Sequence, residues 1–113
     1  MSTIPVHDIP QAPPQATVEQ QVRRLLATWR EQTAFLSSST ALVAHPAYQG
    51  LIALGRSALP FLFRDMEQTF DGHLSSALVA ITGAQPVPPE EGGKIRKVAE
   101  RWLVWARKNG YPR

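Results

Sequence analysis

The sequence predicts an all-α fold, a compact bundle of about five helices, and three observations lead to that class. Apolar residues recur at spacings of three and four positions along most of the chain, which is the period of a helix that buries one face. No stretch of useful length alternates apolar and polar residues as a half-buried strand does. A chain of 113 residues, 43% hydrophobic and 19% charged, has the size and composition of a single globular domain.

Residues 1–16 form a segment of their own because they contain four prolines. Proline lacks a backbone donor and keeps the preceding residue out of the helical conformation. We therefore expect a flexible, proline-rich arm over residues 1–16 and a helical domain over residues 17–113. The arm carries the apolar side chains of Ile4, Val6 and Ile9, which are candidate contacts for a partner protein or a second copy of the chain.

The first helix is expected to begin at Thr17. Thr17 and Gln20 form a capping-box pattern, in which each side chain binds a backbone amide at the start of the helix. The apolar stripe that follows contains Val18, Val22, Leu25, Leu26, Trp29 and Leu36. Three serines over 37–39 are expected to end the helix, since short hydroxyl side chains compete for backbone hydrogen bonds.

The rest of the chain divides at turn residues. A short helical turn is expected over 40–44, before the break at His45-Pro46. Pro46 suits the first position of a helix, and Gly55 suits its end, so a helix is predicted over 46–54. Ser57 is predicted to cap the next helix. The remaining helices are predicted over 58–70, 73–82 and 94–109, with a turn-rich loop over 84–93.

Residues 53–62, Ala-Leu-Gly-Arg-Ser-Ala-Leu-Pro-Phe-Leu, resemble the middle of a HEAT-type repeat, where one helix ends at Leu-Gly and the next opens with Ala-x-Pro-x-Leu. Residues 76–83 then resemble the first helix of a next repeat. A free-standing solenoid needs about three repeats. The resemblance therefore implies a HEAT-like helix pair capped by the N- and C-terminal helices.

Further landmarks lie across residues 29–111. They are His45-Pro46-Ala47-Tyr48-Gln49, Ile81-Thr82-Gly83, Pro86-Val87-Pro88, and Trp102-Leu103-x-Trp105 closing at Gly110-Tyr111. With these landmarks the chain resembles a family of small uncharacterised bacterial helical proteins. The resemblance implies a bacterial origin and a helical fold, and it implies no activity.

No catalytic, cofactor-binding or metal-binding pattern stands out. The chain has no cysteine, which excludes a disulfide, a thiolate ligand and a cysteine nucleophile. Its three histidines lack the spacing of a metal motif, and no serine lies in a nucleophile elbow. His45 is expected to cap a helix or pack beneath the turn at Pro46. We therefore expect no enzyme and no cofactor.

The last predicted helix is basic. Residues 94–113 carry seven basic residues and one acidic residue, whereas residues 1–93 carry five basic and eight acidic residues. Lys94, Lys97, Arg101 and Lys108 recur on one helix face, which can follow a row of phosphates or simply face water. Trp105 lies at the margin of the apolar stripe and is a candidate partner contact.

These observations favour a protein-interaction or regulatory module of a bacterial cytoplasmic system that binds a partner protein through the arm and helix faces. The alternative is a nucleic-acid-binding protein that uses the basic C-terminal helix. No apolar run approaches the roughly 20 residues of a membrane helix, so we expect no membrane partner. The pattern leaves the oligomeric state open.

Overall fold

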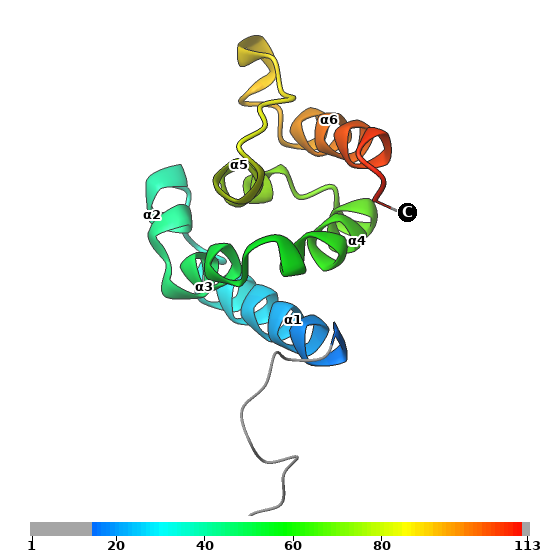
Figure 1. The fold of residues 1–113 in the computed structure, drawn as a ribbon. Helices are drawn as coiled ribbons and strands as arrows, with labels where there is room; N and C mark the ends of the chain where they lie inside the picture. Colours follow the sequence, from blue (N-terminus) through cyan, green and yellow to red (C-terminus); the bar gives the residue numbers. More distant parts are fainter. Residues whose placement is uncertain (1–14, 112–113) are drawn as a thin grey trace, which may run out of the picture.

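A computed structural model describes residues 15–111 and confirms the predicted all-α class (Figure 1). No strand occurs within these residues. The α-helices are α1 Gln15–Gln32, α2 Ser39–Ala44, α3 Pro46–Leu54, α4 Leu59–Thr69, α5 Ser75–Thr82 and α6 Ile95–Lys108. Three short 3₁₀ helices join them, which are η2 Gly55–Ala58, η3 Gly72–Leu74 and η4 Pro89–Glu91.

The helices stack in an order that differs from their order in the sequence. α1 lies against α3, α3 lies against α5, and α4 lies against α6. Figure 1 shows α1 along one edge of the molecule and α6 at the opposite edge, with α3, α4 and α5 between them. The short helix α2 packs on α3 and stands at the side of this stack.

Helix α1 begins and ends earlier than the sequence predicts. It starts at Gln15 and stops at Gln32, so the predicted start at Thr17 is wrong by two residues and the predicted inward position of Leu36 is also wrong. The Thr33 hydroxyl donates to the carbonyl oxygen of Trp29 at 2.5 Å and is buried as the chain turns. Leu36 is consequently 46% exposed.

His45 connects two helices, which confirms its predicted structural role. Its Nδ1 accepts the backbone N–H of Ala47 at 3.0 Å and so caps α3, which begins at Pro46. Because Nδ1 is an acceptor, the ring proton lies on Nε2, which donates to the Oε1 of Gln32 at 2.8 Å. The imidazole therefore ties the end of α1 to the start of α3.

The turn between α3 and α4 contains one confirmed and one wrong prediction. Gly55 ends α3 at φ 67°, a region that favours glycine, as predicted. Ser57 does not cap α4, because its hydroxyl donates back to the carbonyl oxygen of Leu54 at 2.8 Å. The helical path continues from η2 into α4, where the amide of Leu59 binds the carbonyl of Arg56. The first amide of α4 thus has a backbone partner and needs no side-chain cap.

A buried hydroxyl joins the middle of the fold. Tyr48 on α3 is fully buried, and its hydroxyl donates to the carbonyl oxygen of His73 at 2.8 Å. The same oxygen accepts the backbone N–H of Ala77 at 2.9 Å, so α3 holds both η3 and α5. The ring centroid of Tyr48 lies 5.1 Å from that of Trp29, whose indole N–H donates to the carbonyl of Leu42 at 3.0 Å. These contacts link α1, α2, α3 and α5.

A second polar contact holds α6 against α5. The indole N–H of the buried Trp102 donates to the hydroxyl of Ser75 at 2.8 Å. Gly72 permits the close approach of η3 to α6, because a Cβ there would clash with the carbonyl oxygen of Ile95. The start of α6 and the start of α5 are therefore side by side.

We predict that Tyr48→Phe lowers the free energy of unfolding by about 1–3 kcal/mol, because the amide of Ala77 then loses its partner inside the core. Urea unfolding measures the loss. Tyr111→Phe is the matched control, since the Tyr111 hydroxyl makes no hydrogen bond within residues 15–111, and it should change stability by less than about 0.5 kcal/mol. Equal effects of the two variants would contradict the role assigned to Tyr48.

The same hydroxyl gives a pH prediction. Burial raises the pKa of Tyr48 from 10.0 to about 12. The unfolded tyrosine ionises first, so the stability from this group is complete below pH 10 and is lost as the pH rises toward 12. The chain has two tyrosines, so in Tyr111→Phe an ultraviolet titration reports Tyr48 alone. A midpoint near 10 would show that the hydroxyl is not buried as described.

Candidate interaction surfaces

Charged residues are absent from two long segments of the chain. No Asp, Glu, Lys or Arg occurs over residues 32–55 or over residues 72–89. The fold places these two segments together, because α3 packs on α5 and the Tyr48 hydroxyl binds backbone groups of the second segment. The surface built by α2, α3 and α5 therefore carries no formal charge except for its histidines. Depletion of charge is the feature that distinguishes the centre of a protein–protein interface from ordinary surface.

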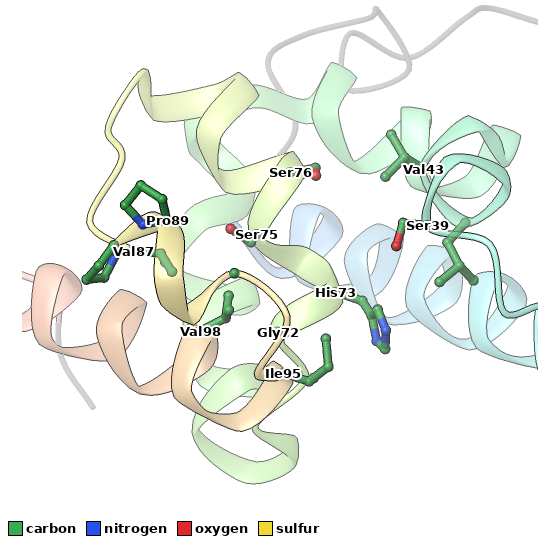
Figure 2. A pocket seen from close by; sticks show the side chains of 13 residues that line it. Ser39, Val43, Gly72, His73, Ser75, Ser76, Val87, Pro89, Ile95 and Val98 are labelled. Carbon is green, nitrogen blue, oxygen red and sulfur yellow. The ribbon is translucent and has the colours of Figure 1, made fainter.

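This uncharged surface is hollowed between α2 and α5. One hollow of about 250 Å³ lies among α2, the start of α5, the 84–93 loop and the start of α6. Figure 2 shows Ser39 and Val43 of α2 on one side of it and Val87 and Pro89 of the loop on the other. A wider hollow of about 520 Å³ adjoins it over α2, α3 and α5, and the two share Ser39, Val43 and Ser76. We call the two together the α2–α5 groove.

The groove has an apolar floor and hydroxyls at its rim. Val98 and the partly exposed Ile95 of α6 form part of its lining, and no Asp, Glu, Lys or Arg contributes. The hydroxyls of Ser39 and Thr40 make no hydrogen bond within residues 15–111, so both are available to a ligand. The hydroxyl of Ser75 is engaged by Trp102. The groove thus combines an apolar floor with two hydroxyls at its rim that have no hydrogen-bond partner within residues 15–111.

An ion-pair network lies behind the groove. Arg30 donates to both carboxylate oxygens of Asp65, at 2.9 and 2.7 Å, and to Asp71 at 3.0 Å. Hydrogen bonds to Asp65, the largest contribution, outweigh the effect of burial and raise the pKa of Arg30. The Oδ1 of Asp71 lies 3.0 Å from the Nδ1 of His73 and accepts the His73 backbone N–H at 3.1 Å. The network therefore fixes the turn between α4 and α5.

The chemistry of His73 is limited by its neighbours. An aspartate paired with Nδ1 is the arrangement that orients a catalytic histidine. In the described part of the chain, however, no serine or threonine hydroxyl hydrogen bonds to the ring of His73. Residues 15–111 also hold no cluster of three or more His, Asp or Glu side chains suited to a metal ion. The expectations of no enzyme and no cofactor stay predictions.

The basic face of α6 is partly neutralised. Lys94, Lys97, Arg101 and Lys108 are all exposed, as predicted. Arg101 is paired through two hydrogen bonds of 2.8 and 2.7 Å with Glu91, which holds the pKa of that carboxyl below its usual range. No ion pair joins Lys94, Lys97 or Lys108 to a carboxylate within residues 15–111. Three lysines on this face are thus free of a carboxylate partner.

The other candidate residues lie apart from this face. Trp105 is half-buried, with its ring centroid 5.6 Å from that of Trp102 and 6.2 Å from that of Tyr111. It packs α6 against Phe63 on α4, at a ring-centroid distance of 6.0 Å, and lies outside the α2–α5 groove. The arm residues Ile4, Val6 and Ile9 lie outside the described residues.

The sequence pattern did not predict the α2–α5 groove. A signal was present, because the two uncharged segments are visible in the sequence. Taken separately, each uncharged segment predicts only a buried helix flanked by turns. The sequence pattern does not show that Tyr48 joins them, and without that contact they do not make one surface.

Comparison of the chain with protein families, curated proteins and solved structures found no match. The resemblances to a HEAT-type pair and to a bacterial family therefore stay predictions. None of the helices within residues 15–111 combines the length and the apolar character that crossing a membrane requires.

Proposed function

We propose that this chain is a protein-interaction module that binds a partner protein through the α2–α5 groove. The N-terminal arm, with Ile4, Val6 and Ile9, supplies a second contact. The observation that carries the proposal is the absence of Asp, Glu, Lys and Arg from the lining of the groove, where the ring of His73 is hydrogen bonded to Asp71. A regulatory role in a bacterial cytoplasmic system is part of the proposal and rests on the family resemblance.

The chemistry of the groove favours a peptide segment of a protein. A hollow of about 250 Å³ has room for one or two apolar side chains against Val98 and Ile95. The free hydroxyls of Ser39 and Thr40 are placed to bind the amides and carbonyls of an extended chain. A phosphate finds no Lys or Arg there, and the ring of His73 is already hydrogen bonded to Asp71. An uncharged, partly apolar segment is therefore the ligand that this lining fits.

We predict that a carboxylate placed in the groove weakens partner binding without unfolding the chain. Thr40 and Ser76 are exposed and lie in the first turns of α2 and α5, where an acidic side chain is compatible with the helix dipole. Thr40→Glu and Ser76→Glu should each weaken binding at least about tenfold, because the new charge loses water in the complex. Binding is measured by titrating the purified variants with a partner captured on the wild-type chain.

Gln68→Glu is the matched control, because Gln68 is exposed on α4 and does not line the groove. It should bind like the wild type. Deletion of residues 1–14 tests the arm separately and should weaken binding while leaving the effect of Ser76→Glu in place. Unchanged binding by both groove variants would reject the groove as the site.

The second candidate function is nucleic-acid binding, and the three lysines of α6 without carboxylate partners favour it. Lys94 and Lys97 are exposed three positions apart, and Arg101 follows four positions later, so all three share one face. Such a face binds phosphates with an affinity that falls as salt rises, by a slope close to the number of phosphates contacted.

If this candidate holds, the triple variant Lys94→Glu, Lys97→Glu, Arg101→Glu loses binding to a duplex in a mobility assay at low salt. Arg24→Glu on α1 is the control, because it reverses an exposed charge on another helix, and this variant should still bind the duplex. For the wild type we then expect a slope of log affinity against log salt near −3. Absent binding at low salt, or binding that is insensitive to salt, rejects the second candidate.

A further inference from the structure

The turn that follows α1 presents an aromatic side chain to water. Phe35 is fully exposed, at 101%, and Leu36 beside it is 46% exposed. The turn is anchored, because Thr33 is buried and its hydroxyl binds Trp29, and because the amide of Leu36 donates to the carbonyl of Thr33 at 2.9 Å. Phe35 thus projects from a fixed turn and has no ring contact within residues 15–111.

A hollow adjoins this aromatic side chain on the same surface. It measures about 240 Å³ and includes Leu36, Trp29, Arg30 and Leu42 in its lining. The guanidinium carbon of Arg30 lies 5.9 Å from the centroid of the Trp29 ring, and the guanidinium is held in place by Asp65 and Asp71. The Trp29 ring is 3% exposed, so an aromatic ring in the hollow would meet mainly the partly exposed guanidinium of Arg30, a group that favours the face of a ring.

Phe35 does not occupy this hollow, although it lies next to it. A surface with a projecting group beside a matching hollow is complementary to itself when it is rotated by half a turn. Two copies of the chain can then each place a ring in the hollow of the other. The contact also brings no like charges together, because residues 32–44 carry no formal charge and the Arg30 of the hollow is already paired with Asp71.

We infer that the chain forms a two-fold dimer in which Phe35 of each copy enters the hollow lined by Trp29, Arg30 and Leu36 of the other. This surface adjoins the α2–α5 groove, since Leu42 and His73 line both, but Trp29, Arg30 and Leu36 lie outside the groove. The dimer presents two grooves, and its formation does not depend on whether the groove binds a partner.

Sedimentation equilibrium of the full chain tests the dimer. The wild-type mass should rise with concentration from 12.5 kDa toward twice that value. Phe35→Ser should weaken association by roughly 100-fold or more, because each dimer loses two buried rings. Its urea unfolding should match the wild type at concentrations where both are monomeric, since Phe35 is fully exposed in the single chain. Val104→Ser is the control, because Val104 is a 39% exposed apolar residue on α6, and it should associate like the wild type.

Single-cysteine variants give a second measurement. The chain has no cysteine, so a disulfide in Ser37→Cys can only join two copies. It should form rapidly under mild oxidation and slowly when Phe35→Ser is added. A wild-type chain that keeps the monomer mass at every concentration overturns the dimer, as does association that Phe35→Ser leaves unchanged. If the wild type is a monomer but Phe35→Ser loses a captured protein, then Phe35 contacts a different protein and the dimer is rejected, while partner binding stands.

Discussion

The buried hydroxyl of Tyr48 determines how the uncharged half of the molecule is arranged. It lies between α3 and the η3–α5 segment, donating to one backbone carbonyl and accepting one backbone amide. An unpaired polar group inside a core costs about 1–3 kcal/mol, so this oxygen restricts how α5 can sit on α3. The Trp29 indole, which packs at a tilt against the Tyr48 ring, then places α2 by its hydrogen bond to Leu42. Both walls of the groove thus depend on two neighbouring aromatic residues with polar ends.

The charges of the protein are separated along with its helices. α1, α4 and α6 carry ion pairs such as Arg30 with Asp65 and Arg101 with Glu91, whereas α2, α3 and α5 carry no formal charge. Within the described residues the hollow beside Phe35 lies at the border, where the uncharged turn meets the Arg30 network. Burying an uncharged surface against another apolar surface lowers the free energy, whereas the charged helices are better solvated by water. This separation is the physical basis for assigning interaction to one half of the molecule.

Much of the fold could be predicted from local signals. Pro46 and Gly55 delimit α3 by their own backbone chemistry, and the helical period correctly placed Lys97, Arg101 and Lys108 on an exposed face of α6. The predictions are wrong where a long-range or competing contact determines where a helix ends or which side chain is buried. Thr33 ends α1 through its bond to Trp29, which a periodic pattern does not show, and Leu36 is exposed as a result. The role of Gly72 is likewise not visible in the sequence, because its missing side chain matters only through the close approach of α6, which closes the floor of the groove.

The candidate sites were harder to predict from the sequence than the helices were, because they depend on contacts between distant segments. The basic face of α6 follows from one helix and was predicted, but its pairing with Glu91 required the path of the preceding loop. The groove combines α2, α5 and α6 and was not predicted.

Hydrogen–deuterium exchange on the wild-type chain with and without its captured partner tests the central claim most directly. The account predicts slower exchange in α2 and the start of α5 upon binding, with α6 beyond Val98 unchanged. Slower exchange along the exposed face of α6, with α2 and α5 unaffected, would contradict it.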